Sequence, residues 1–354
     1  MKKILRKPFF IRLFHWEYWP FNLVYSPIYV FWFWLGIKSR AVFFFNTSNP
    51  SIKNGGFLLE SKKQIYDLIP AQYYPRTLLF SAATAGNEIL DELRKTKLRF
   101  PLIAKPDIGM RGLMVEKVHS AEELLSYSSR SKVDFLVQEF IPFEKEAGIF
   151  YYRYPNEKKG HISGIVGKEF LTVTGNGIST VEQLLQQDPR FILQMSVLQR
   201  THSGILRQVL SKDEEHLLVP YGNHSRGAKF IDISHLIDEA LIDTIDEVCK
   251  KVPGFYFGRL DIRYNSWEEL RLGKNFSIIE LNGAGSEPTH IYDPRHSIFY
   301  AWKEIIRHLV ILYKISKQNH KSLHMPYMKF ALGMQMLKDN TAYVKLISKP
   351  NHQR

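Results

Sequence analysis

Alternation of apolar and polar residues is clearest in two segments of the last third of the chain. The segments FYFGRLDIRY, which begins at Phe255, and FSIIELNGAGSE, which begins at Phe276, are predicted to form two β-strands joined by a polar connection. Helical spacing of apolar residues is strongest over residues 234–252 and 298–317. In the sequence, the two predicted strands therefore lie between two predicted amphipathic helices.

The middle of the chain alternates short strands with a glycine-containing loop and capped helices. FPLIAKPDIGMRGLMVEKV predicts two strands around that loop, and VDFLVQEFI predicts another strand. Between them, SAEELLSYSS predicts a helix whose first turn is capped by Ser120 and Glu123. Further along, GIFYYRYP and HISGIVGKEFLTV predict a hairpin-rich sheet, STVEQLLQQ a capped helix, and LLVPYGNHSRGAKFIDIS a strand with a polar loop.

The segments on either side of this region are less strongly patterned. Residues 41–97 predict a small α/β unit with strands at Ala41–Phe45 and Pro75–Phe80 and helices at Leu59–Leu68 and Glu88–Leu98. From Gln318 onward the chain is basic and weakly patterned, so no element is predicted for the tail, residues 318–354.

Residues 1–40 form an aromatic and basic arm that contains four of the six tryptophans. Aromatic residues with basic neighbours are typical of segments at a membrane–water interface, so the arm predicts an anchor on the inner face of a membrane. The apolar run from Phe21 to Ile37 is barely long enough to cross a bilayer and contains Pro27. A true span and an arm packed on the protein remain the alternatives.

Composition narrows the class of partner. The 354 residues carry a formal net charge of +13, which suits an anionic partner such as a nucleotide or a membrane surface. The basic residues are scattered rather than clustered with aromatics on one sheet, which disfavours nucleic acid as the partner. A single cysteine, Cys249, excludes an intrachain disulfide framework and fits a cytoplasmic location.

The two predicted strands bring four polar side chains to one surface. Because residues two apart on a strand point the same way, Arg259 and Asp261 share a face, as do Glu280 and Asn282. Two carboxylates and an amide oxygen are ligands that suit Mg²⁺ beside a nucleotide's phosphates. The alternative is a hairpin whose polar face is merely solvated.

A lysine precedes the glycine-containing loop of the middle region. Lys105 ends a predicted strand directly before PDIGMRG, where glycines allow backbone amides to approach a phosphate. The loop differs from a Walker A sequence, since GxxxxGK[ST] does not occur in the chain. HExxH, paired CxxC and GxSxG sequences do not occur either, so hydrolase mechanisms based on zinc or an activated serine have no support.

In this order, PLIAKPDIGMRG, QEFIPFEKE, VTGNGISTVEQLL and GRLDIRY with IIELNG make residues 98–310 resemble the ATP-grasp superfamily. The resemblance is greatest to the nucleotide domain of D-alanine:D-alanine ligases and cyanophycin synthetases. It implies an α+β fold in which two α/β subdomains of residues 98–317 clasp ATP, preceded by the short α/β unit and the arm. The small size of residues 41–97 departs from the family, which usually carries a larger amino-terminal substrate domain.

The resemblance also assigns roles to individual residues. It implies that Lys105 holds phosphates, with Lys62 or Lys63 as a second phosphate ligand, and that Gly109, Arg111 and Gly112 form a flap over them. It implies that Gln138, Glu139, Phe140 and Ile141 form the adenine hinge and that Glu146 binds the ribose. It implies that Asp261, Glu280 and Asn282 hold Mg²⁺, with Mn²⁺ as an alternative ion, and that Arg259 steadies the reacting phosphoryl group, with Arg226, Lys229 and Lys168 as additional cations.

The implied activity is that of a ligase. It would transfer the γ-phosphoryl group of ATP to a carboxylate, after which an amine or similar nucleophile would displace phosphate. The alternatives are a kinase that phosphorylates a hydroxyl and a non-catalytic, membrane-associated nucleotide-binding protein. The sequence identifies neither the acid nor the nucleophile, and it leaves the oligomeric state open.

Overall fold

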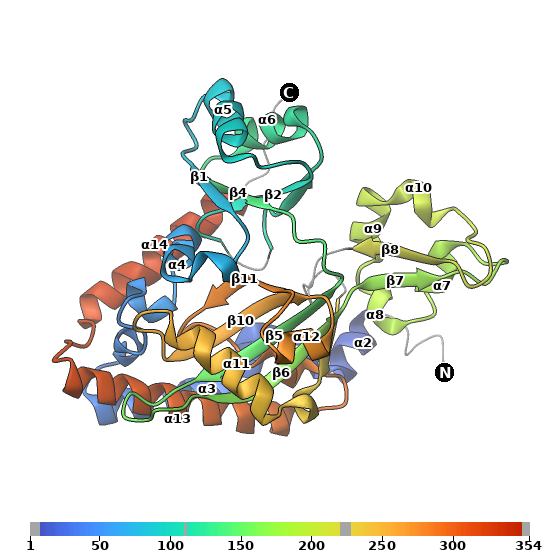
Figure 1. The fold of residues 1–354 in the computed structure, drawn as a ribbon. Helices are drawn as coiled ribbons and strands as arrows, with labels where there is room; N and C mark the ends of the chain where they lie inside the picture. Colours follow the sequence, from blue (N-terminus) through green and yellow to red (C-terminus); the bar gives the residue numbers. More distant parts are fainter. Residues whose placement is uncertain (1–7, 110–111, 220–227, 349–354) are drawn as a thin grey trace.

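The computed structural model describes residues 8–109, 112–219 and 228–348 of the chain. The fold is α+β, as predicted, and within these ranges the strands form antiparallel sheets of four, five and two strands. Two of the sheets, each with its own helices, form the pair of α/β subdomains that the ATP-grasp resemblance implies (Figure 1). The domain boundaries themselves stay predictions.

The first subdomain has a four-stranded sheet in the order β1-β4-β2-β3. Its elements are β1 (Thr77–Phe80), α5 (Gly86–Thr96), β2 (Leu102–Pro106), β3 (Glu116–Val118), α6 (Ala121–Arg130) and β4 (Phe135–Glu139). Ile89 of α5 and Leu124 of α6 are fully buried against Val137 of β4. Ser120 caps α6 by accepting a hydrogen bond from the backbone of Glu123, as the sequence predicts.

The second subdomain has a five-stranded sheet in the order β11-β10-β5-β6-β9. Its strands are β5 (Lys145–Tyr152), β6 (His161–Glu169), β9 (Lys229–Asp232), β10 (Phe257–Tyr264) and β11 (Phe276–Asn282), and its long helices are α11 (Glu239–Lys250) and α13 (Ile298–Ser322). Neighbouring residues of β5 face opposite cores, with Ile149 packed among residues of α11 and Phe150 among residues of α13. The sheet is therefore covered on both faces, and its residues alternate between two apolar cores.

A smaller lobe projects from this sheet (Figure 1). It contains β7 (Leu171–Thr174), α7 (Val181–Leu185), α8 (Pro189–Ile192), α9 (Met195–Thr201), α10 (Ser203–Leu206) and β8 (Glu215–Val219) around a core of its own. Thr180 and Gln183 form the capping box of α7. The remaining short elements are η1 (Trp16–Tyr18), η2 (Phe44–Thr47), η3 (Lys53–Gly56), α4 (Lys62–Leu68), η4 (Ala71–Tyr73), η6 (Ser234–Leu236), α12 (Trp267–Arg271) and η7 (Thr289–Tyr292).

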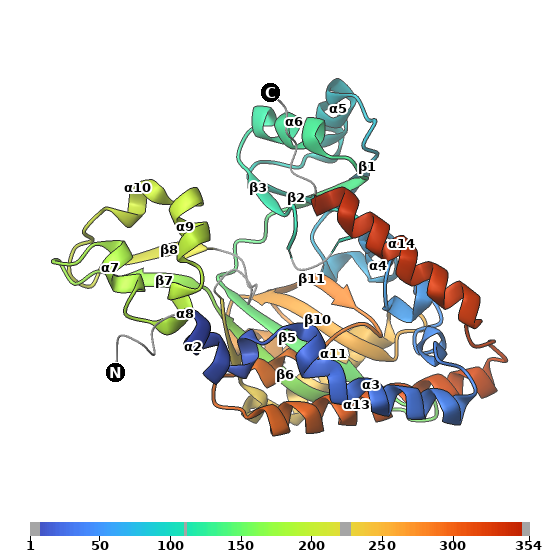
Figure 2. The ribbon, with the colours of Figure 1, turned by 180° about the vertical axis from the view of Figure 1, so that it is seen from behind.

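The described part of the arm, residues 8–40, contains the α-helices α2 (Pro8–Phe14) and α3 (Phe21–Ser39) with η1 between them, and α3 lies along α13 (Figure 2). Val24 and Ile28 pack against Ile305 of α13, and the indole nitrogen of Trp302 donates a hydrogen bond to the carbonyl of Val24 at 2.8 Å. In the part of the chain that the structure describes, no helix combines the length and apolarity needed to cross a membrane.

Two expectations for the ends of the core are corrected. The segment Ala41–Phe45 is not a strand, because Phe44 and Phe45 belong to η2 and are buried against α13, and only Phe43 makes an isolated bridge, to Met328. The tail, for which no element was predicted, contains α14 (Phe330–Ser348). This helix follows α13 in the chain and runs toward β2 of the four-stranded sheet (Figure 2). The hydroxyl of Tyr343 on α14 donates to the carbonyl of Ile108.

Residues 49–56 are joined by backbone contacts to the loop that follows β11. The amides of Ala284 and Gly285 donate to the carbonyls of Gly55 and Gly56, both at 2.9 Å. A Cβ atom added at Gly283 would lie 2.5 Å from the Gly55 carbonyl oxygen. Glycine is thus required at 283 because two backbones touch there, and the contact fixes the end of β11.

We expect Gly283→Ala to destabilise the protein by about 1–3 kcal/mol, because the added methyl group must displace backbone rather than a flexible side chain. Urea unfolding followed by circular dichroism measures the change. Gly204→Ala is the matched control, since a Cβ atom there meets nothing within 4 Å and alanine favours the helical conformation of α10. Equal midpoints for the two variants would contradict the close approach at Gly283.

Candidate active site

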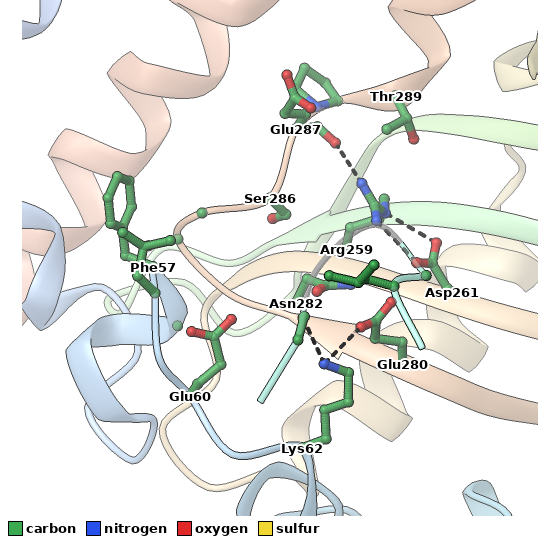
Figure 3. Close-up of a pocket in the computed structure, with 18 of the residues that line it drawn as sticks. Phe57, Glu60, Lys62, Arg259, Asp261, Glu280, Asn282, Ser286, Glu287 and Thr289 are labelled. Atoms are coloured by element: carbon green, nitrogen blue, oxygen red, sulfur yellow. Dashed lines mark hydrogen bonds and ion pairs between the residues drawn. The ribbon is translucent and has the colours of Figure 1, made fainter. Parts of the chain in front are cut away.

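The hairpin of β10 and β11 places its four polar residues in direct register. Arg259 lies opposite Asn282, and Asp261 lies opposite Glu280. Phe257, Arg259 and Asp261 face the same cavity, whereas Leu260 is buried in the core on the opposite side of the sheet. The alternation predicted from the sequence therefore brings these groups to one site (Figure 3).

Asp261 lies between two cations. The guanidinium of Arg259 donates to both of its carboxylate oxygens, at 3.1 and 3.0 Å, and the ammonium of Lys168 lies 3.2 Å from Oδ1. Burial alone would raise the pKa of Asp261, but Arg259 and Lys168 outweigh burial and lower it to about 2. The carboxylate is therefore ionised at neutral pH, although its side chain is almost fully buried.

The predicted ribose ligand joins the same network. Glu146 of β5 lies 2.7 Å from the ammonium of Lys168 and 3.6 Å from the guanidinium of Arg263. Its side chain is as deeply buried as that of Lys168 and lines the cavity. Lys168 thus links Glu146 to Asp261 across the sheet, and contact of Glu146 with a ribose stays a prediction.

Lys105 enters the cavity from β2 of the other subdomain. Its ammonium donates to the hydroxyl of Tyr66 and to Oε1 of Gln138, both at 2.9 Å, and to the carbonyl of Ile279 at 3.3 Å. Burial lowers the pKa of Lys105 to about 8, despite the opposing effects of Glu280 and Asp107. The ammonium of Lys105 is therefore buried, and these three hydrogen-bond acceptors are all uncharged.

The structure distinguishes the two neighbouring lysines of α4. Lys62 lines the cavity, where its ammonium lies 2.9 Å from the carbonyl of Gly109 and 3.5 Å from Oε1 of Glu280. Lys63 instead pairs with Asp67 one turn along the same helix. Of the two lysines, Lys62 is therefore the one that reaches the cavity beside Glu280, and its contact with a phosphate stays a prediction (Figure 3).

The remaining predicted residues fall into three groups. Those that line the cavity are Gly109, Gly112, Gln138, Glu139, Phe140 and Ile141. Lys229 does not line it, because its ammonium faces Glu169 on the neighbouring strand, 3.7 Å away. Arg111 and Arg226 lie outside the residues that the structure describes. The hinge and flap roles of the lining residues stay predictions.

The ligand set fits a divalent cation that also contacts phosphate. Asp261 and Glu280 supply carboxylates, and the side-chain nitrogen of Asn282 is buried without a hydrogen-bond partner among the described residues. Since an amide can be turned over without changing its shape, this orphaned atom marks where the amide oxygen could meet a ligand. Among the described residues, no group of three His, Cys, Asp or Glu side chains is arranged to hold a metal ion. A Mg²⁺ ion held by one or two carboxylates usually has phosphate and water oxygens as its other ligands.

Several residues at the site were missed by the sequence analysis. Glu60 and Glu287 line the cavity, and Tyr66 lies behind it as a partner of Lys105. One oxygen of Glu60 is buried without a partner among the described residues, and Glu287 accepts hydrogen bonds from Tyr25 and Tyr292. Glu287 had a sequence signal, since it closes the polar loop directly after β11, whereas the positions of Glu60 and Tyr66 depend on packing that no local pattern reveals.

No protein-family model and no curated protein match the chain. Among solved structures it is similar to a bifunctional glutathione synthetase from Pasteurella multocida, with 14% identity, a TM-score of 0.38 and coverage of 72% of this chain and 38% of that one. It is also similar to the VanG D-Ala:D-Ser ligase of Enterococcus faecalis, with 15% identity, a TM-score of 0.41 and coverage of 72% and 61%. For the D-alanine–D-alanine ligase of Bacillus anthracis the values are 12%, 0.42, 74% and 68%.

The chain therefore spans 38% and 61% of the lengths of the first two proteins. All three TM-scores lie below 0.5, so these structures carry no argument about function. A function for this chain is inferred from the arrangement of side chains in the cavity.

We expect ATP affinity to fall about tenfold per pH unit above pH 8, because Lys105 of the free protein loses its proton there and binds phosphate only when charged. Titration calorimetry between pH 7 and 9.5 measures the slope. Adenosine is the control ligand, since it lacks phosphates and its affinity should change little. Lys105→Met should weaken ATP binding at pH 7 and abolish the slope, and an unchanged slope in that variant would contradict the assignment.

Proposed function

We propose that this chain is an ATP- and Mg²⁺-dependent ligase that activates a carboxylate as an acyl phosphate and joins it to an amine. The observation that carries the proposal is the convergence of cations and oxygen ligands in one cavity. The cations are Lys62, Lys105, Lys168 and Arg259, and the oxygen ligands are Asp261, Glu280 and Asn282. Buried charges of both signs in one cavity are costly unless a charged ligand belongs there.

The cations suit a triphosphate because they come from both subdomains. Lys105 belongs to β2 of the first subdomain, whereas Arg259 and Lys168 belong to the five-stranded sheet of the second. Lys62 contacts both subdomains, because its ammonium donates a hydrogen bond to the carbonyl of Gly109, in the loop after β2, and lies 3.5 Å from Glu280 of β11. Phosphoryl transfer depends mainly on positioning and on positive charge near the transferring group, and this arrangement supplies both.

Asp261, Glu280 and Asn282 would hold Mg²⁺, which would neutralise charge on the phosphate oxygens. The chain's own residues orient the reactants. Arg259 is fixed by Asp261 on one side and by the carbonyl of Glu287 at 3.2 Å on the other, so its position does not depend on a ligand. It is placed to stabilise negative charge on the reacting phosphoryl group.

The reaction balances in two steps. A substrate carboxylate oxygen attacks the γ-phosphorus of ATP and the bond to ADP breaks, which gives an acyl phosphate and ADP. The nitrogen of the amine then attacks the acyl carbon, phosphate leaves with the bonding electrons, and the amine loses a proton. The products are an amide, ADP and phosphate.

Glu280→Gln should keep the fold and lose at least about a hundredfold in Mg²⁺-dependent turnover, because one anionic metal ligand becomes neutral at constant shape. Its melting temperature without metal should stay close to that of the wild type, because the lost charge is repelled by Asp261 opposite on β10 and attracted by Lys62 at 3.5 Å. The assay follows release of phosphate from ATP with a panel of carboxylates and amines.

Glu169→Gln is the matched control, since Glu169 is a more exposed glutamate of the same sheet that pairs with Lys229 away from the cavity. Its turnover should equal that of the wild type. Full activity of Glu280→Gln would overturn the metal assignment. Transfer of phosphate to a hydroxyl without its release would identify a kinase instead.

We also propose that the arm attaches the protein to the inner, anionic face of a membrane. Leu23, Val30 and Ile37 recur every seven residues on α3 and form an exposed apolar stripe, with Val30 at 72% and Ile37 at 77% exposure. The ammonium of Lys38 lies 4.0 Å from the ring centre of Trp34 beside this stripe. Apolar residues flanked by basic ones suit the interface of an anionic bilayer.

The double variant Val30→Glu with Ile37→Glu should weaken binding to phosphatidylserine-containing vesicles by at least about tenfold, because two carboxylates replace apolar contacts with the lipid. Co-sedimentation measures the bound fraction. Leu272→Glu is the control, since Leu272 is 66% exposed but lies after α12, away from the arm. Equal binding by all three proteins would contradict the arm as the attachment site.

A further inference from the structure

The cavity continues beyond the polar residues of the hairpin into an apolar region. Its total volume is about 1530 Å³, whereas sites for small molecules usually measure about 300–1,000 Å³. The apolar part is formed by one side of α3, by α13, by α14 and by the segment before Glu60. It includes Val24, Ile28, Trp32, Phe57, Leu312 and Met334. There is therefore room for a second ligand beside a nucleotide, against mainly apolar walls.

The polar and apolar parts meet at the loop after β11. Tyr25 of α3 donates a hydrogen bond to Glu287, and Tyr292 donates to the same oxygen at 3.1 Å. Glu60 and Phe57 lie on one side of Asn282, and Asp261 lies on the other (Figure 3). The aromatic arm thus contributes both a wall of the apolar region and a contact to an acidic residue at its polar end.

Two buried polar atoms of the cavity have no hydrogen-bond partner among the described residues, one carboxylate oxygen of Glu60 and the hydroxyl of Thr289. Glu60 lies on the side of Phe57, whereas Thr289 lies beyond Arg259 (Figure 3). Burial raises the pKa of Glu60, and the charge of Glu280 adds to the rise. A donor cation placed between Phe57 and the hairpin would satisfy the Glu60 oxygen.

We propose that the nucleophile substrate is an amphiphilic amine whose apolar tail lies between α3, α13 and α14 and whose amino group lies at Glu60. This inference rests on the proposed ligase for the reaction of the amine, whereas binding of the amphiphile does not require ATP. The exposed stripe on the outer side of α3 supports it, since one helix then contacts both the lipid surface and the substrate's tail.

The test is calorimetric titration with straight-chain primary amines of increasing length, below their micelle concentrations and without nucleotide. Each methylene group that enters the apolar region should raise the affinity about fourfold, which corresponds to about 0.8 kcal/mol per buried group. Straight-chain carboxylates of equal length should bind more weakly, because Glu60 repels them. An affinity that does not change with chain length, or tighter binding of the carboxylates, would overturn the proposal.

Met334→Trp should abolish the gain for the longer amines, because the indole would occupy the apolar region. Leu332→Trp is the matched control on the same helix, since Leu332 is 61% exposed and is not a lining residue, and it should keep the gain. Leu337→Trp and Lys338→Trp form a second lining and non-lining pair on α14, for use if either first variant fails to fold. Equal loss or equal retention within a folded pair would contradict the placement of the tail.

The two proposals fail in different ways. Chain-length-dependent amine binding without any ATP turnover would refute the ligase and leave the amphiphile site in place. Turnover with short amines that does not improve with longer ones would refute the amphiphile and leave the ligase in place.

Discussion

The buried carboxylate of Asp261, between the ammonium of Lys168 and the guanidinium of Arg259, constrains the rest of the site. Removing either cation would leave Asp261 with one positive partner in place of two, and breaking a buried ion pair typically costs about 3–5 kcal/mol. The three groups come from β6 and β10, which both pair with β5. Strand register and charge pairing therefore depend on each other, and the cations are in place before any ligand binds.

The two subdomains meet through hydrogen bonds to one carbonyl of β11. The hydroxyl of Tyr66 and the ammonium of Lys105 both donate to the carbonyl of Ile279, one residue before Glu280. Lys105 therefore lines the cavity and also donates a hydrogen bond to β11, the edge strand of the five-stranded sheet. Burial keeps its proton weakly held, so a phosphate that restores a counter-charge would strengthen its protonated form.

Residue alternation predicted the hairpin because period-two patterns depend only on neighbours in the sequence, and Asp261 and Glu280 indeed lie opposite each other. Local patterns could not choose between Lys62 and Lys63, since that choice depends on which face of α4 packs against β11. The run containing Phe44 was assigned to a strand because a short apolar run fits several buried conformations.

The arm and the tail show a different limit of pattern analysis. Helix α3 is apolar on all sides, so the sequence cannot show that Ile28 packs on α13 while Val30 is exposed. Helix α14 has apolar residues on both its buried and its exposed sides, as Met336 and Leu332 illustrate. In both helices apolar residues occur on the buried side and on the exposed side, so the sequence shows no amphipathic pattern.

Helix α14 connects the parts of the cavity that the strands leave apart. Phe330 at its start contacts Phe43 in the apolar region, and Tyr343 near its end donates to the carbonyl of Ile108, beside the glycine-containing loop. The ammonium of Lys62 donates a hydrogen bond to the carbonyl of Gly109, the next residue of that loop. A single helix therefore forms a wall of the apolar region and contacts the loop beside Lys62, so the two halves of the cavity share one boundary.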